Sequence, residues 1–160
     1  MQQLTTTGLL SALIVISGSL KLPSPFPGGE FQLSAPIAVL ICACFGFKRY
    51  LTAGIIASLI GLALGTSTIF NVLIAMVFRL VAGAVLALGG TSLITIMLSG
   101  PLGTLAARLV LAQVVNVNWQ ILAWAALPGM IFTAIAAGAL YKPAVKLLGQ
   151  IPHLRQQLVK

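Results

Sequence analysis

Two arginines lie within otherwise apolar stretches, Arg79 in NVLIAMVFRLVAGAVLALGG (71–90) and Arg108 in LITIMLSGPLGTLAARLVLAQ (93–113). A guanidinium near the centre of a membrane-spanning helix costs about 2.5–3.5 kcal/mol on insertion scales, so an intramembrane arginine suggests a function. Guanidinium groups are suited to carboxylates, which they bind through two parallel hydrogen bonds. The chain holds nine lysines and arginines but one acid, Glu30. Two buried arginines therefore cannot both be neutralised internally, and a bound anion would supply the missing charge.

The helix period indicates that both arginines face the interior of a helix bundle. Small residues share their helix faces, as expected where helices pack closely: Ala75, Ala82 and Gly83 around Arg79, and Thr104 and Ala112 around Arg108. Two alternatives stay open. Arg79 could donate to helix carbonyls, and Arg108 could extend outward to the membrane surface.

Further polar and aromatic residues cluster in QVVNVNWQILAW (113–124) and at the start of the fourth apolar segment. We predict that these positions, like both arginines, lie in the outer half of the membrane. We predict a pocket open to the outside. Its predicted ligand-binding residues are Arg79, Arg108, Trp124, Asn71, Gln113, Asn116, Trp119 and Glu30. Trp119 could instead anchor its helix at the membrane interface, and Asn71 could cap one. Glu30 could pair with Lys21 or with an arginine.

No enzymatic chemistry is indicated. The chain has no Asp, and its single Glu and single His are far apart in sequence. Cys42 and Cys44 lie in an apolar run and are interpreted as buried small hydrophobes. We expect no catalytic residues, no metal, no cofactor and no ATP hydrolysis by this chain.

Composition indicates an all-α integral membrane protein. Hydrophobic residues make up 59% of the chain and charged residues 6%, whereas soluble domains carry about 25% charged residues. A helix needs about 20 mostly apolar residues to cross a bilayer. We predict one transmembrane domain over 1–160, with six spans at 4–20, 31–47, 50–65, 70–88, 93–113 and 120–141. The second and third are short and could form a re-entrant pair.

Basic residues predict the orientation, because Lys and Arg are enriched on the cytoplasmic side. Lys48 and Arg49 follow the second span, and a basic tail (142–160) follows the sixth. With six spans, both positions and both termini are cytoplasmic. The tail either is solvated or lies on the membrane surface. This use of positive charge does not indicate nucleic-acid binding.

The loop at 21–31 is either a connector or a lid.

Small residues also recur four apart, as Gly8 and Ala12 in the first segment and as Gly54 and Ser58 in the third. Such spacing lets helices approach closely. It serves either internal packing or docking to a partner membrane subunit.

The chain resembles the substrate-binding S component of energy-coupling factor transporters. The stretches EFQLSAPIAVLICACFGFKRYLTAGIIASLIG and PGMIFTAIAAGALYKPAVKLL are similar to that family's second, third and last helices. The resemblance implies a bacterial plasma-membrane subunit that captures a vitamin or similar solute from outside. It implies a transmembrane T component and two cytoplasmic ATPases as partners, docking through small residues of the first helix, here Gly8 and Ala12. It also implies that the first loop is a lid.

Two other classes fit parts of the pattern. A structural or assembly membrane protein, sporulation- or holin-like, would not need two buried arginines beside a polar pocket. A stand-alone secondary carrier would be expected to show inverted repeats and membrane-embedded acids. We favour the S component with a small, carboxylate-bearing vitamin or amino-acid-like solute.

Overall fold

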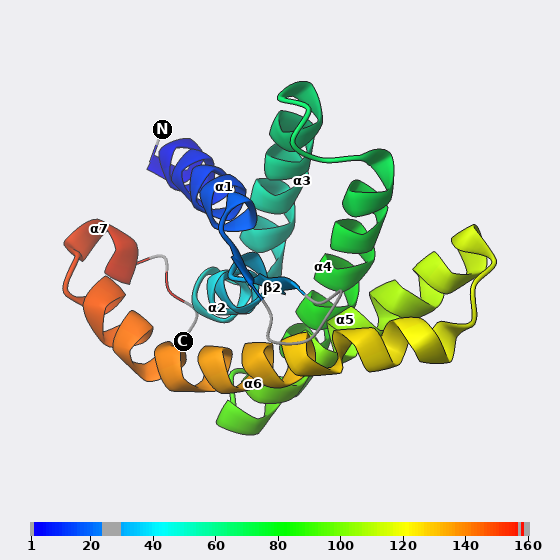
Figure 1. Cartoon of the computed structure of the whole chain (residues 1–160). Coiled ribbons are helices and arrows are strands. Elements are labelled where there is room, and N and C mark those ends of the chain that lie inside the picture. The colour runs from blue at the N-terminus through cyan, green and yellow to red at the C-terminus, as the bar shows by residue number, and fades with distance from the viewer. Residues whose placement is uncertain (1, 24–29, 157, 159–160) are drawn as a thin grey trace.

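The computed structural model describes residues 2–23, 30–156 and 158. These residues form a helical bundle with one short strand pair (Figure 1). The elements are α1 (Gln2–Ser19), β1 (Lys21–Pro23), β2 (Glu30–Gln32), α2 (Ser34–Phe45), α3 (Phe47–Ala63), α4 (Ile69–Gly89), α5 (Leu93–Val115), α6 (Trp119–Gly149) and α7 (Pro152–Arg155).

Polar caps determine where the three long helices begin. Thr68, Ser92 and Asn118 precede α4, α5 and α6, and each side chain accepts a hydrogen bond from a backbone N–H of the first turn. Such a bond satisfies one of the amides that a helix leaves unpaired at its start. Asn116 ends α5 in the left-handed conformation, with φ 55°, which Asn tolerates better than most residues.

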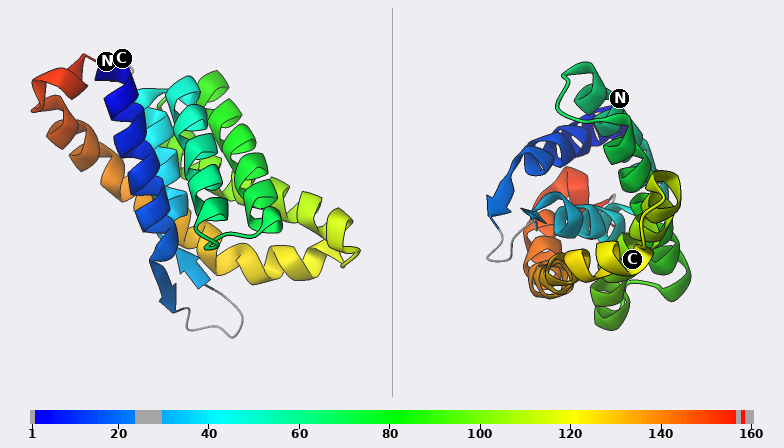
Figure 2. Two further views of the ribbon diagram at one scale, coloured as in Figure 1. Left: turned by 90° about the horizontal axis from the view of Figure 1, so that it is seen from above. Right: turned by 45° about the vertical axis from the view of Figure 1, so that its right-hand side comes forward.

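The short helix α2 occupies the centre of the bundle, surrounded by α1, α3, α4, α5 and α6 (Figure 2). Eight of its twelve residues are buried, from Pro36 to Phe45. It is apolar nearly throughout, as expected of a helix that packs on all sides. The surrounding helices contact their neighbours in the order α1, α3, α4, α5, α6.

The outer surface of the bundle is apolar. Large hydrophobic side chains are widely exposed along the surrounding helices, including Leu4, Ile69 and Leu88, the last at 90%. Within the described residues, α4, α5 and α6 are long and apolar enough to cross a membrane, whereas α1 and α2 are apolar but shorter. The chain is therefore a helical membrane protein. Six spans and the orientation of the termini stay predictions.

The predicted segments correspond to α1–α6, with two main differences, and part of the predicted lid is not described. The segment at 31–47 is helical only from Ser34 to Phe45, because Glu30–Gln32 pairs with Lys21–Pro23 as an antiparallel strand. The sixth segment continues past 141 to Gly149 despite Pro143, so part of the predicted tail is helix. Residues 24–29 of the predicted lid lie outside the described residues.

The bundle has two distinct ends (Figure 2). The hairpin end holds the β1–β2 pair and the turns α3–α4 and α5–α6. The opposite end, here the basic end, holds the start of α1, the α2–α3 junction and the C-terminal part of α6. The exposed side chains of Lys48, Lys142 and Lys146 lie at the basic end.

Candidate functional site

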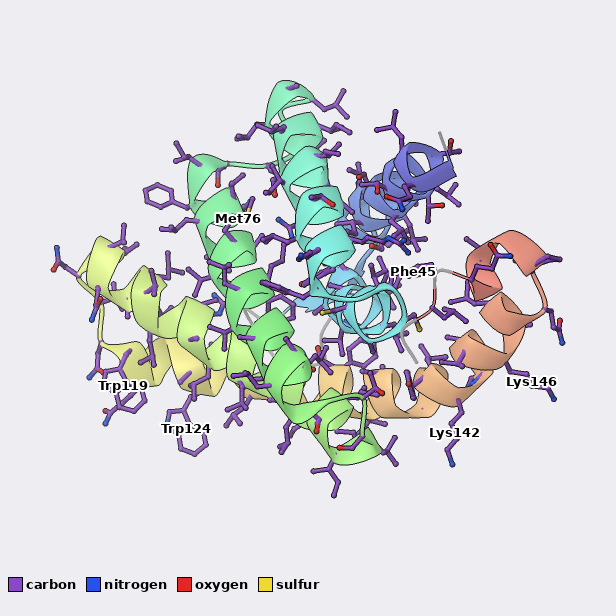
Figure 3. All side chains as sticks on the ribbon, turned by 180° about the vertical axis from the view of Figure 1, so that it is seen from behind. Phe45, Met76, Trp119, Trp124, Lys142 and Lys146 are labelled. Atoms are coloured by element: carbon purple, nitrogen blue, oxygen red, sulfur yellow. The ribbon has the colours of Figure 1, made fainter. Side chains whose placement is uncertain are left out.

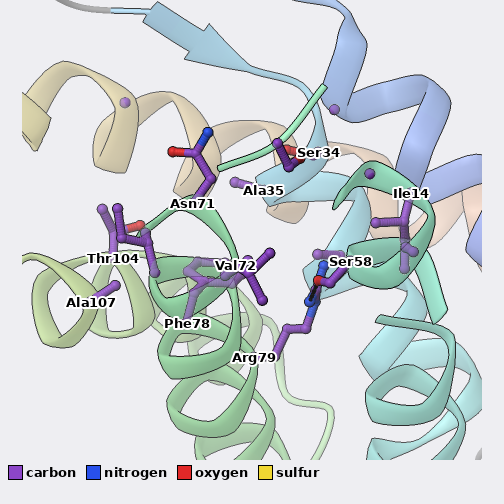
Figure 4. Close-up of a pocket in the computed structure, with 18 of the residues that line it drawn as sticks. Ile14, Ser34, Ala35, Ser58, Asn71, Val72, Phe78, Arg79, Thr104 and Ala107 are labelled. Carbon is purple, nitrogen blue, oxygen red and sulfur yellow. Dashed lines mark hydrogen bonds between the residues drawn. The ribbon is translucent and has the colours of Figure 1, made fainter. Parts of the chain in front are cut away.

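A cavity of about 1120 Å³ lies among helices α1 to α6, each of which contributes lining residues (Figure 4). Small polar residues line it towards the hairpin end: Ser19, Ser34, Thr66, Ser67 and Asn71. Its size is comparable to that of known small-molecule sites, which span roughly 300–1,000 Å³.

Arg79 is a buried cation in this cavity, with 7% of its surface exposed. Its Nη1 donates a hydrogen bond to Ser58 Oγ on α3, at 2.7 Å, and lies 3.9 Å from Met76 Sδ. Among the described residues it makes no ion pair and no bond to a helix carbonyl. The guanidinium therefore keeps most of its five N–H donors for another partner.

Gly54 creates the room that Arg79 needs to reach α3. A Cβ placed on Gly54 would lie 2.5 Å from both Cδ and Nε of Arg79, well inside van der Waals contact. Ser58 follows Gly54 by one helical turn on the same face of α3, and both are buried. The pair predicted from four-residue spacing therefore serves internal packing, and it holds the arginine.

Arg108 lines the same cavity from α5 and is half-buried. Thr104, one turn earlier, also lines the cavity, and its hydroxyl donates to the Gly100 carbonyl at 3.0 Å. In the described part of the chain Arg108 has no hydrogen-bond partner. Both arginines thus face the bundle interior, as the small residues beside them indicated.

Apolar side chains separate the polar groups of the cavity. Phe78 packs against Gly103 of α5, where an added Cβ would lie 2.9 Å from its ring. Figure 4 shows Phe78 and Val72 between Thr104 and Ala107 on one side and Arg79 with Ser58 on the other. The cavity therefore combines two cationic residues, Arg79 and Arg108, with an apolar wall formed by Phe78 and Val72.

Tyr50 is a second buried polar group near Arg79. Its side chain is fully buried, and its hydroxyl has no hydrogen-bond partner among the described residues. It lies close enough to Arg79 to interact with its charge. Cys42 and Cys44 are buried free thiols, as predicted, and no cluster of three metal-ligating side chains occurs among the described residues.

Three of the eight predicted site residues line the cavity: Arg79, Arg108 and Asn71. Asn71 is not the cap of α4. Thr68 is, and it accepts a hydrogen bond from the Asn71 backbone N–H. The side chain of Glu30 lies outside the described residues, although its backbone pairs with Pro23.

The other four predicted residues lie outside the cavity lining. Gln113 and Asn116 are exposed, and Asn116 ends α5. Trp119 and Trp124 are 49% and 73% exposed, and Figure 3 shows both directed away from the bundle. Trp124 therefore does not lie where it would stack on a ligand in this cavity.

Sequence reasoning did not assign ligand-facing roles to several lining residues, including Ser58, Phe78, Thr104 and Thr133. A signal for two of them was present. Ser58 was noted for its spacing from Gly54, and Thr104 for its position one turn before Arg108. Phe78 has no such signal, because one more aromatic residue in an apolar helix is unremarkable.

The predicted docking residues lie on the outer face of α1. Gly8 and Ala12 are exposed, and no atom lies within 4 Å of a Cβ placed on Gly8. The inward face carries Leu10, Ser11 and Ile14 instead. Gly8 and Ala12 are therefore free of internal packing.

Comparison with known proteins identifies a relative of high similarity. The chain is 50% identical over 133 residues to Protein BioX of Lysinibacillus sphaericus, which covers 83% of this chain and 80% of that protein. No family model matches the chain, and no solved structure matches it.

Proposed function

The chain belongs to the same family as Protein BioX, and we propose that it is the solute-binding subunit of an uptake transporter in the bacterial cell membrane. The proposed ligand is a small solute that carries a carboxylate. The observation that carries this proposal is the cavity lined by Arg79, a buried cation whose hydrogen-bond partner is neutral.

The chemistry of the cavity supports a carboxylate ligand. Burying a charge without a counter-charge is unfavourable, and Ser58 offers one neutral oxygen to a group with five donors. A carboxylate would accept two parallel hydrogen bonds from the guanidinium and neutralise it. The apolar wall around Phe78 suits the hydrocarbon part of such a ligand.

We propose that transport energy comes from other subunits, namely a transmembrane T component and a pair of cytoplasmic ATPases, as the resemblance to S components implies. The outward-facing Gly8 and Ala12 of α1 support this docking role, since small residues permit close helix approach. On this proposal the chain is not an enzyme and needs no cofactor. Its basic end faces the cytoplasm.

Two competing functions are less well supported. A stand-alone carrier would be expected to use a membrane-embedded acid for ion coupling, and the chain's only acid, Glu30, lies in β2 at the hairpin end. A purely structural membrane protein has no need for a cavity of about 1120 Å³ containing a buried cation.

Ligand-dependent stabilisation of the purified protein tests the proposal. The protein in detergent is heated with biotin, nicotinate, pantothenate or unbranched dicarboxylates from succinate to azelate. A ligand at about 100 times its Kd stabilises the folded state by roughly 2.7 kcal/mol. We expect at least one carboxylate to stabilise wild type and Lys48→Met, an exposed-cation control, but not Arg79→Met.

The stability of the empty variants separates the alternatives. Replacing a buried charge by an apolar side chain of similar length is often neutral or stabilising, so we expect empty Arg79→Met to be at least as stable as wild type. If no carboxylate stabilises the wild type and Arg79→Met is less stable, Arg79 is a packing residue and the structural function is favoured.

A further inference from the structure

The cavity presents two guanidinium groups, and the chain can neutralise at most one of them with its own acidic side chains. Arg79 and Arg108 both line the cavity, and Glu30 is the only Asp or Glu in the sequence. An inference about the number of charges on the ligand follows, and it rests on the proposed ligand-binding function.

The two charges come from different helices, and Arg108 belongs to the helix that lines the Thr104 side of the cavity. Arg79 extends from α4 to α3, where Ser58 accepts its hydrogen bond. Arg108 belongs to α5, one turn after Thr104. Phe78 and Val72 stand between the Thr104 side of the cavity and Arg79 (Figure 4). A single carboxylate held by Arg79 against Ser58 would therefore leave Arg108 without a partner.

We infer that the ligand is an unbranched dicarboxylate, with one carboxylate on Arg79, the other on Arg108, and its hydrocarbon chain along Phe78. Each guanidinium then gains a bidentate partner. The apolar wall between them receives methylene groups, whose burial is favourable by about 0.8 kcal/mol each.

The lining disfavours the other small anions that arginines bind. A zwitterionic amino acid would place an ammonium in the cavity, and the described lining residues include no carboxylate to receive it. A phosphate group is usually held by several converging donors, such as clustered cations or the amides of a helix N-terminus. Here the described lining holds two cations on different helices, and apolar side chains such as Phe78 and Val72 belong to the same lining.

Glu30 offers the alternative that must be tested. If its carboxylate neutralises Arg108, a ligand with one carboxylate suffices. Replacing Glu30 by Gln would then remove the internal partner and create a preference for two carboxylates that the natural chain lacks.

The test compares each dicarboxylate from succinate to azelate with its methyl half-ester, which keeps the same carbon chain between the carboxyl groups but carries one negative charge. Binding is measured by calorimetry on the purified wild type, Arg108→Gln and Glu30→Gln. We expect at least one dicarboxylate to bind wild type at least about tenfold more tightly than its half-ester. In Arg108→Gln this preference should disappear, because the dicarboxylate loses more affinity than the half-ester. Glu30→Gln should keep the wild-type preference.

Several outcomes overturn the inference while leaving the proposed function in place. Equal binding of dicarboxylate and half-ester by wild type is one. Binding of biotin, a monocarboxylate, without binding of any dicarboxylate is another. Equal weakening of both ligands in Arg108→Gln would make Arg108 structural. If no carboxylate of either kind binds, both the inference and the proposed function fail.

Discussion

Replacing Gly54 by Ala should displace Arg79 and impair both stability and ligand binding. The added Cβ would lie 2.5 Å from Cδ and Nε and 3.0 Å from Cζ of Arg79. Because these atoms lead to the guanidinium, relieving the collision moves Nη1 away from Ser58 Oγ, its partner at 2.7 Å. The substitution therefore changes the position of the charge without removing it.

Three contributions set the size of the effect. Ala is favoured over Gly in a helix by up to about 1 kcal/mol. Overpacking costs about 1–3 kcal/mol, and loss of a hydrogen bond from a charged group costs about 1.5–3 kcal/mol. Since moving the arginine relieves part of the collision, we expect a net loss of about 2–3 kcal/mol in the free energy of unfolding. Denaturant titration in lipid–detergent micelles measures this difference.

A double-mutant cycle isolates the contact from general helix effects. Gly54→Ala should lower stability in wild type but not in Arg79→Ala, where the colliding side chain is gone. Gly8→Ala, an equivalent change with no atom within 4 Å of the added Cβ, should be neutral or slightly stabilising. Equal destabilisation by Gly54→Ala in both backgrounds, or unchanged carboxylate affinity, would refute the assignment of Gly54 as the residue that makes room for Arg79.

Two further predictions concern Tyr50 and Gly8. Tyr50→Phe should leave the free energy of unfolding unchanged or raise it by about 1 kcal/mol, because it removes a buried hydroxyl without a described partner. A loss of about 1 kcal/mol or more in the same denaturant titration would show that the hydroxyl makes a hydrogen bond. Gly8→Leu should abolish solute uptake by cells that carry the ATPase partners while leaving binding to the purified subunit intact, because it blocks the outer face of α1; uptake at the wild-type level would exclude docking through this face, and Gly8→Ala is the control that should transport normally.

The sequence located the helices because hydrophobic length and turn residues determine them locally. Gly46 and Gly90, both with positive φ, end α2 and α4 within two residues of the predicted span ends at 47 and 88. The pairing of β1 with β2 was not predictable in this way, since it joins Lys21–Pro23 to Glu30–Gln32 across the loop. Residues 31–33 were therefore assigned to the second helix. Pro143 was taken as part of a tail, although it is within α6.

Site residues that are costly to bury could be predicted from the sequence. Residues whose role depends on which face of their helix they occupy were predicted less well. Arg79 and Arg108 stood out because charge in an apolar segment requires explanation. Trp124 was assigned to the pocket only because it lies several residues inside the sixth predicted span. In α6 the cavity is lined by Leu122, Ala125, Ala126, Pro128, Gly129 and Thr133. Most of these residues share one helix face, and Trp124 is two residues from both Leu122 and Ala126. That offset places it on the opposite face, and the periodicity applied to Arg79 would have shown this.

On the proposed function, the buried position of Arg79 links ligand affinity to the stability of the empty protein. Its guanidinium is buried, and the described residues offer it one hydroxyl and a distant sulfur as partners, so the chain itself compensates only part of the cost of burying the charge. A carboxylate that neutralises it recovers that free energy, whereas a neutral analogue of the same shape does not. The proposed ligand gives a physical reason for an arginine at this position, and a stability gain in Arg79→Met accompanied by loss of carboxylate binding would demonstrate that the two properties oppose each other at this residue.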